Sequence, residues 1–445
     1  MSKFQIINGL VYLDGQLKAA DITVDEGIIS GIHIQGTNEE KDAIQCPKYD
    51  AKGLVVFPGF VDIHVHFREP GFEEKETILT GTMAAAHGGY TSVCTMPNLN
   101  PIPDSLETLN IEREKIKETA LVHVFPYGAI TVNEKGTALS NMEEMASFVA
   151  AFSDDGVGVQ SRDMMKEAMI EAKRLGKSIV AHAEEIELVN GGVIHDGDYA
   201  KKHNHKGNPS VSEWKQVERD IELARETGAS YHVCHVSTKE SIEFVAKAQE
   251  EGLNVTCETA PHYLVFNDSM LQEDGRFRMN PPIRAKEDQE ALIHALNAGN
   301  IVAIATDHAP HTREQKAGGL DHSLNGIVGL ETAFPACYTY LVKTGIISLQ
   351  TLVDRLTVYP IERLKLNEVI EAKESKGVAK KIAVGEPCDI TLFDLDNPYV
   401  IDAEEFLSKG KSSPFLGHKV YGKCIMTMVG GEIAYQDKER ISCRK

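Results

Sequence analysis

The sequence lacks the features that mark a disulfide-stabilised, secreted or membrane-inserted chain. Its eight cysteines are scattered, and no two of them form a C-x-x-C pair, which argues against a disulfide framework. The opening residues, MSKFQIINGL, contain no apolar core of the kind found in secretory signals. No stretch approaches the roughly 20 consecutive apolar residues that a membrane helix needs. We therefore expect a protein of the reducing cytoplasm that does not bind membranes.

Positive charge is also in short supply. The 46 Lys and Arg residues face 66 Asp and Glu residues, which gives a formal net charge of −20. This balance argues against a nucleic-acid partner, whereas a local positive site for an anionic small molecule stays compatible with it. With 445 residues, 42% hydrophobic and 25% charged, the chain can bury one large core and a smaller one.

From about residue 60 the sequence alternates between short apolar runs and stretches with helical periodicity. Three such helical stretches, 161–176, 212–228 and 286–299, end in glycine, a common helix stop. Eight strand-then-helix units predict an α/β fold, a (β/α)8 TIM-type barrel, with its active site at the C-terminal ends of the strands. The predicted strands are 61–67, 91–97, 121–128, 148–154, 178–184, 230–236, 254–260 and 301–307.

The two ends of the chain have a different pattern. Residues 1–56 and 383–445 carry short alternating strands that are broken by D-G and G-G turn pairs. Neither segment has helical periodicity. We expect a small β-sandwich domain that is built from both ends, beside a barrel domain at 57–382.

Potential metal ligands follow several of the predicted strands. His64 and His66 are two positions apart and therefore face the same way. A single histidine in a strand is more often a core residue, and Asp-Asp-Gly is more often a plain turn. Here, however, potential ligands stand at the ends of five strands that meet at one mouth of the barrel, and this favours a metal site. The later ligands, at the ends of strands four, five, six and eight, are Asp154 or Asp155, His182, His235 and Asp307.

Four imidazoles and two carboxylates exceed what one tetrahedral zinc ion needs. They suit two metals that share a bridging ligand and activate a hydroxide. Such a site also needs a base that carries the proton to a leaving nitrogen. Asp307 is placed for that task, and one member of the Asp154–Asp155 pair for the bridge.

Two neighbouring residues have competing interpretations. Arg68 follows His66 by two positions, so its planar guanidinium can grip a substrate carboxylate, although a surface ion pair with Glu69 is the alternative. Cys234 lies beside a candidate ligand and could be a nucleophile. A small buried hydrophobic residue is the interpretation that we favour.

Several motifs together carry a family resemblance: DIHVHFREPG, MPN, PYGAITV, FSDDGVGV, HVCHVSTK, MNPPIR and ATDHAPH. The chain resembles, over its whole length, the longer, multidomain bacterial type of the dihydroorotase family in the amidohydrolase superfamily. The resemblance implies a zinc-dependent cyclic amidohydrolase of pyrimidine (UMP) biosynthesis. Its reaction is the reversible cyclisation of N-carbamoyl-L-aspartate to (S)-dihydroorotate plus water, with a hydroxide activated by two zinc ions and Asp307 as proton shuttle.

The resemblance also implies a role for each matching position. One zinc ion would be held by His64, His66 and Asp307, and the other by His182 and His235. Asp155 would bridge them, in the place where related hydrolases carry a carboxylated lysine, so the second zinc is expected to bind less tightly. The implied substrate contacts are Arg68, Asn98 and His311 for the carboxylate, and Asn280, Asn325 and Gly326 for the ring.

Some expectations stay open at the sequence level. His262 receives no role, and residues 311–326 are a candidate mobile lid. The alternative enzyme is a hydantoinase, dihydropyrimidinase or allantoinase. Arg68 and the absence of the bridging lysine argue against this alternative. An inactive scaffold is the rival from another class, although every ligand is retained. The family further implies a homodimer and a possible association with aspartate transcarbamoylase.

Overall fold

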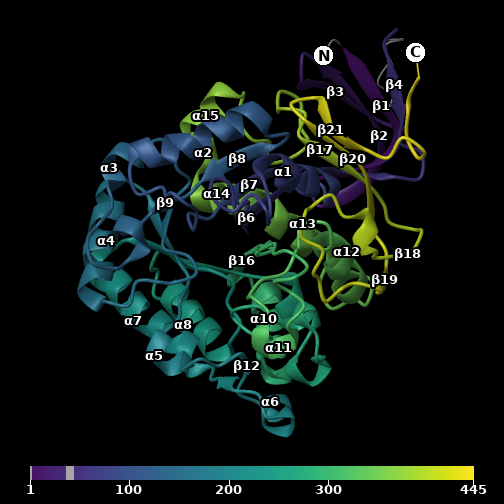
Figure 1. Ribbon diagram of the computed structural model, residues 1–445. Coiled ribbons are helices and arrows are strands. Elements are labelled where there is room, and N and C mark those ends of the chain that lie inside the picture. Colours follow the sequence, from purple (N-terminus) through teal and green to yellow (C-terminus); the bar gives the residue numbers. More distant parts are fainter. Residues whose placement is uncertain (1–2, 37–44, 445) are drawn as a thin grey trace.

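The computed structural model describes residues 3–36 and 45–444. Residues 1–2, 37–44 and 445, which belong to the predicted terminal domain, lie outside the described residues. Through the middle of the chain, strands mostly alternate with helices as predicted, although the predicted strand 121–128 is divided into two strands with no helix between them (Figure 1). The strands of this part are β6 (Phe60–Val65), β7 (Tyr90–Thr95), β8 (His123–Pro126), β9 (Gly128–Ala129), β10 (Phe152–Ser153), β11 (Ser178–Ala181), β14 (Ser230–Val233), β15 (Val255–Thr259) and β16 (Ile301–Ile304).

These strands pair in parallel in two sheets, β6-β7-β8 and β9-β10-β11-β14-β15-β16. The sheets adjoin at both ends. Between β8 and β9 only Tyr127 intervenes, and its hydroxyl donates to the carbonyl of Ile63 at 2.9 Å. Beyond β16, a parallel bridge joins His308 to Val65, and the backbone N–H of His66 donates to the carbonyl of His308 at 2.8 Å.

Helices with an apolar stripe pack against these strands; the helix at Arg162–Arg174, for example, buries Met165, Ala168, Met169 and Ala172. The three helical stretches predicted from periodicity are present as α4 (Arg162–Arg174), α7 (Val211–Thr227) and α10 (Lys286–Ala298). The left-handed residues Gly228 and Gly299 end the last two. The other long helices are α1 (Ile78–His87), α2 (Leu106–Thr119), α8 (Lys239–Glu250), α13 (Leu349–Leu356) and α14 (Val358–Leu364).

The shorter elements lie mostly in the connections. The short helices are α3 (Met142–Met145), α5 (Ile186–Val189), α6 (Asp198–His203), α9 (Pro261–Val265), α11 (Gly319–His322), α12 (Ala333–Cys337) and α15 (Ile370–Glu374). The short strands are β12 (Ile194–His195), β13 (Gly207–Asn208), β18 (Tyr399–Val400) and β19 (Lys419–Val420). Within the described residues, no helix combines the length and the apolar character required to span a bilayer.

The prediction for strand four was too long. The sequence 148–154 is apolar, but only Phe152–Ser153 is extended. Residues 146–149 continue the turn after α3, where the N–H of Phe148 donates to the carbonyl of Met145 at 2.9 Å. The stretch is apolar because Val149, Ala150 and Ala151 are buried without being part of a strand.

The two ends of the chain contribute to one nine-stranded sheet, at the upper right of Figure 1. β5 pairs antiparallel with β17, which joins the N-terminal to the C-terminal strands. This sheet has its own apolar cluster, which includes Val11, Ile22, Ile390 and Met426. Its strands are β1 (Phe4–Leu13), β2 (Gln16–Asp25), β3 (Ile28–Ile34), β4 (Lys48–Asp50), β5 (Val55–Pro58), β17 (Ile390–Asp394), β20 (Lys423–Val429), β21 (Glu432–Gln436) and β22 (Cys443–Arg444).

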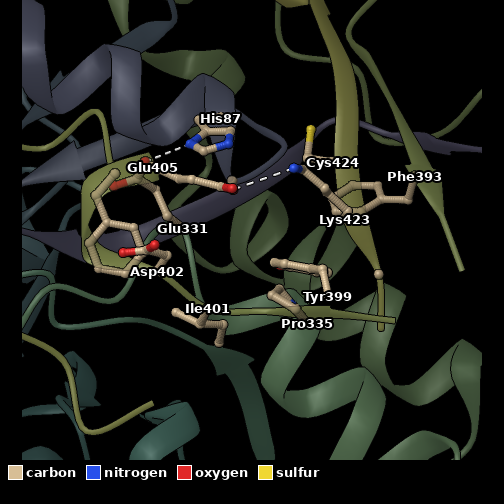
Figure 2. A pocket seen from close by; sticks show the side chains of 13 residues that line it. His87, Glu331, Pro335, Phe393, Tyr399, Ile401, Asp402, Glu405, Lys423 and Cys424 are labelled. Atoms are coloured by element: carbon tan, nitrogen blue, oxygen red, sulfur yellow. Dashed lines mark hydrogen bonds and ion pairs between the residues drawn. The ribbon is translucent and has the colours of Figure 1, made fainter. Parts of the chain in front are cut away.

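A small hollow lies where this C-terminal part packs against the end of α1 (Figure 2). His87 Nδ1 contacts Glu331 Oε1 at 2.6 Å, and Lys423 Nζ contacts Glu405 Oε2 at 3.3 Å. The hollow encloses about 20 Å³, and one water needs about 10 to 15 Å³ of such space. It therefore has room for about one water molecule and is too small for an organic substrate.

Candidate functional site

The six predicted metal ligands lie at or just beyond the C-terminal ends of their strands, as predicted from the sequence. His64 is on β6 and His66 follows it, while the other four follow β10, β11, β14 and β16 in turn. None is more than 6% exposed. The complete set is His64, His66, Asp155, His182, His235 and Asp307.

Asp307 lies beside the two histidines at the end of β6. Asp307 Oδ1 lies 3.2 Å from His66 Nε2 and 3.7 Å from His64 Nε2. Burial opposes ionisation of Asp307, but His66, His64 and His235 outweigh burial and lower the pKa of its carboxyl below the usual range. Asp307 is therefore an ionised base at neutral pH, with its oxygens directed into the cluster.

Asp155 occupies the centre of the cluster. Its Oδ1 lies 3.4 Å from His64 Nε2, 3.8 Å from His182 Nδ1 and 3.7 Å from His235 Nε2. Its Oδ2 lies 3.4 Å from His66 Nε2. Burial works against its charge, yet the histidines, His64 first, hold the pKa of Asp155 well below its usual range. A carboxylate that reaches all four histidines has the position that a bridging ligand requires.

Asp154 has a different environment, although it is the adjacent residue. Its Oδ1 accepts hydrogen bonds from the backbone N–H groups of Ile130, at 2.7 Å, and Thr131, at 3.0 Å. Its Oδ2 accepts from the Thr131 hydroxyl. Burial raises the pKa of Asp154 to about 6. Asp154 therefore ties β10 to the segment after β9, while Asp155 turns into the cluster.

The cluster fits divalent metal ions. His64 Nε2 and Asp155 Oδ1 are buried, lie 3.4 Å apart, and have no hydrogen-bond partner among the described residues. Buried polar atoms without a protein partner are rare, and they often contact an ion or a water molecule instead. His64, His66 and Asp307 form one group with metal-ligand spacing, and His64, Asp155 and His235 form another. Imidazole and carboxylate donors together suit zinc and similar ions.

Cys234 belongs to a third group, with His64 and Glu258. Its side chain is buried, and burial raises the pKa of its thiol above the usual range. A thiol in this state is a poor nucleophile, because the thiolate is the reactive form. The position agrees with the small buried hydrophobic residue that we favoured from the sequence.

A cavity of about 180 Å³ opens beside the cluster. All six predicted substrate-binding residues line it, together with five of the six predicted ligands. Gly326 has φ +130°, and a Cβ there would lie 2.6 Å from the carbonyl oxygen of Ala309, so this wall requires glycine. The six substrate-binding residues are Arg68, Asn98, Asn280, His311, Asn325 and Gly326.

Arg68 brings an uncompensated positive charge to this cavity. Its side chain is 8% exposed and makes no ion pair with any described residue. Glu69, the alternative partner, instead accepts from the backbone N–H of Ile78 at 2.8 Å. Burial lowers the pKa of Arg68 to about 10, despite the nearby Asp307 and Asp155. A ligand carboxylate would supply the missing partner.

Two predicted carboxylate contacts already have protein partners. Asn98 Oδ1 lies 2.8 Å from His66 Nδ1 and accepts its proton, so Asn98 also orients a predicted ligand. His311 Nε2 donates to the carbonyl of Asn325 at 2.7 Å. Burial, with Arg68 adding to it, lowers the pKa of His311 to about 3. His311 is therefore neutral in the empty cavity.

The backbone is strained at three positions of the site. Arg68, His235 and Asp307 have φ values of +63°, +32° and +49°, which non-glycine residues rarely adopt. Such residues concentrate at functional sites because the surrounding structure must hold them there. The strain aims these three side chains into the cavity region rather than along their strands.

Two glutamates of the site were missed by the sequence reasoning. Glu258 Oε1 lies 2.7 Å from His64 Nδ1. Glu184 Oε2 accepts from Asn280 Nδ2 at 3.1 Å and lies 3.6 Å from His182 Nε2. Both are charged residues in apolar strand sequences, CETA and VAHAE, and that mismatch was the available signal. His262, which received no role, is buried, and burial lowers its pKa to about 4.

Comparison with known proteins decides the family. A family model described as dihydro-orotase-like matches residues 53–241. A dihydroorotase of Geobacillus sp. (strain WCH70) is 47% identical over 427 residues, which cover 95% of this chain and 96% of that protein. A dihydroorotase of Bacillus caldolyticus is 46% identical, with 96% and 98% covered.

The chain belongs to the dihydroorotase family. The solved structures that it resembles include an L-hydantoinase (dihydropyrimidinase) from Arthrobacter aurescens, with a TM-score of 0.83 and 26% identity, covering 98% of this chain and 96% of that one. A dihydropyrimidinase from Brevibacillus agri gives a TM-score of 0.82 at 26% identity, with 98% and 95% covered. The hydantoinases therefore share the fold of this chain at 26% identity, whereas the dihydroorotases are 46 to 47% identical to it.

Proposed function

We propose that this member of the dihydroorotase family catalyses the reversible cyclisation of N-carbamoyl-L-aspartate to (S)-dihydroorotate and water. The observation that carries the proposal is the buried guanidinium of Arg68, which has no ion-pair partner among the described residues and lies beside the cluster of candidate metal ligands. Dihydroorotate carries a carboxylate on ring carbon C6, one methylene group away from the C4 carbonyl of the amide that reacts. A cation at this place supplies its partner, which an uncharged dihydropyrimidine would not use.

The architecture that we propose is the predicted (β/α)8 barrel at 57–382 with a β-sandwich domain from 1–56 and 383–445. The parallel bridge between Val65 and His308 supports closure between β16 and β6. The β5–β17 pairing supports a terminal domain shared by both ends. The likeness to hydantoinase structures over nearly the whole chain is consistent with both parts.

We propose two zinc ions per subunit. His64, His66 and Asp307 would hold one, His182 and His235 the other, and Asp155 would bridge them. Glu184 and Asn98, behind His182 and His66, support these orientations. When bound, the two ions supply an activated water and polarise the amide carbonyl that it attacks. The second ion is expected to bind less tightly, because a carboxylated lysine is missing.

The residues of the chain supply positioning and proton transfer. Arg68, with Asn98 and His311 nearby, holds the substrate carboxylate, while Asn280 and the backbone at Asn325 and Gly326 face the ring. In the hydrolytic direction Asp307 accepts the proton of the attacking water and gives it to the departing ring nitrogen. Cyclisation follows the same path in reverse, so Asp307 then takes a proton from the carbamoyl nitrogen.

Further properties are proposed from the family resemblance alone. They are a homodimer and a possible association with aspartate transcarbamoylase. A cytoplasmic location is proposed from the scattered cysteines. We also propose that residues 311–326 act as a lid. The two ends of this segment, at His311 and at Asn325 and Gly326, line the cavity, which supports this assignment.

Arg68→Met tests the proposed substrate. We expect kcat/KM for dihydroorotate to fall by about 30- to 5,000-fold, because a charge-assisted contact that loses one partner costs about 2 to 5 kcal/mol. Any residual activity on uncharged dihydrouracil should change much less. Steady-state kinetics with both compounds measure the difference.

Arg68→Lys is the matched variant, since it keeps the charge and removes the bidentate fork. It should fall between wild type and Arg68→Met for dihydroorotate. Equal losses on both compounds would mean that Arg68 supports the metal cluster instead. The hydantoinase-type function would then regain support.

A further inference from the structure

Glu258 connects the cluster to a buried network on the far side of His64. It lies on β15, and its side chain is completely buried. Its Oε1 is 2.7 Å from His64 Nδ1, and its Oε2 is 3.2 Å from His232 Nε2. His232 in turn contacts Thr256 Oγ1 through Nδ1 at 2.7 Å. Both carboxylate oxygens are therefore engaged by imidazoles that are themselves fully buried.

This contact determines which nitrogen of His64 carries the proton. A carboxylate can only accept a hydrogen bond, so the short contact requires a proton on His64 Nδ1. An imidazole that binds a metal ion is neutral and has one N–H, so a proton on Nδ1 makes the lone pair of Nε2 the metal-binding one. That atom faces Asp155 Oδ1 at 3.4 Å and Asp307 Oδ1 at 3.7 Å, and has no hydrogen-bond partner among the described residues.

His64 and His66 differ in the residue that contacts their Nδ1 atoms. His66 Nδ1 is held by the neutral amide oxygen of Asn98 at 2.8 Å, whereas His64 Nδ1 is held by a carboxylate. A carboxylate behind a metal-binding imidazole fixes its orientation and makes it a stronger donor. Of the two ligands, His64 thus gains more from its support, and it is the one that belongs to both groups around Asp155 and Asp307.

We propose that Glu258 is a positioning residue that holds His64 as its Nδ1–H tautomer and so presents Nε2 to the metal ion that His64 would share with His66 and Asp307. His232 holds Glu258 in turn, because it contacts the second carboxylate oxygen and so fixes the plane of the carboxylate. This inference rests on the proposed metal site, and it adds residues of β14 and β15 that do not touch substrate or metal.

Glu258→Gln is the test, made in the full-length protein. After removal of metal, Zn²⁺ affinity is measured by competition with a chromogenic chelator, and Co²⁺ is added to a second sample for its visible spectrum. We expect the affinity to fall by about 10- to 100-fold and the Co²⁺ spectrum to change. The Tm of the metal-free variant should stay near that of the metal-free wild type, because the amide is isosteric.

Glu112→Gln is the matched control. Glu112 is also a buried glutamate, 1% exposed, but its hydrogen bond goes to Thr95 Oγ1 at 2.7 Å and not to a histidine. This variant should bind Zn²⁺ like the wild type. Wild-type affinity and an unchanged Co²⁺ spectrum in Glu258→Gln would overturn the proposal, and so would equal losses in both variants.

A second measurement needs no variant. In zinc-loaded wild type labelled with ¹⁵N at histidine, the His64 ring should carry its proton on Nδ1, and a proton on Nε2 would overturn the role of Glu258. If the wild type bound no Zn²⁺, the proposed metal site itself would fail. Tight Zn²⁺ binding that is insensitive to Glu258 would refute only the present inference.

Discussion

Asp307→Asn is expected to lower kcat by about 10²- to 10⁴-fold, the typical contribution of a general acid-base group. The amide can neither accept the proton of the attacking water nor return it to the ring nitrogen. Asp307 is suited to this task because it is ionised, buried and close to His66, whose Nε2 lies 3.2 Å from its Oδ1. Its carboxyl also lines the cavity together with Arg68.

Binding and metal content separate this role from a structural one. Dihydroorotate affinity, measured by calorimetry, should be largely retained, because the proposed carboxylate contacts are elsewhere. Zinc content must be measured in the same sample, since Asn is also a poorer ligand than Asp. A variant that keeps its zinc and more than about a tenth of wild-type kcat would contradict the assignment of Asp307 as proton shuttle.

Asp155→Ala should lose metal and activity together. Asp155 is the carboxylate whose oxygens lie within 3.8 Å of all four histidines, and its removal leaves no group to bridge two ions. Elemental analysis after gel filtration should find less zinc than in wild type. Turnover should fall to the background, because the activated water depends on both ions.

Asp154→Ala is the neighbouring control, and its defect should be of another kind. The change leaves the buried N–H groups of Ile130 and Thr131 without their acceptor. A buried donor that loses its partner costs about 1 to 3 kcal/mol of stability. We expect a lower Tm with zinc retained. Zinc loss in Asp154→Ala and not in Asp155→Ala would show that the two roles are reversed.

The positions of the proposed ligands in the fold were predictable because they follow from strand periodicity and from the parallel arrangement of the strands. His64 and His66 share a face by the two-residue repeat, and parallel strands bring their C-terminal ends together. The choice between Asp154 and Asp155 was not predictable in this way. It depends on the turn after β10, in which Asp154 meets the N–H groups of Ile130 and Thr131.

What the sequence missed depends on contacts between distant elements. Glu258 lies in the middle of a predicted strand, where a strand-end search does not look, and His64 is 194 positions away from it. Asn98 was predicted as a substrate contact only, yet it also supports His66 across β6 and β7. The excess length predicted for strand four arose because the buried residues 149–151, which are not in a strand, are as apolar as a buried strand.

The most direct test of the proposed function is the substrate preference of the purified wild-type protein loaded with zinc. Ring opening is followed for dihydroorotate, dihydrouracil, hydantoin and allantoin under the same conditions, and kcat/KM is compared. We predict that dihydroorotate is preferred by about 30-fold or more, the lower bound expected from the Arg68 contact with its carboxylate. A preference for dihydrouracil or hydantoin would contradict the account.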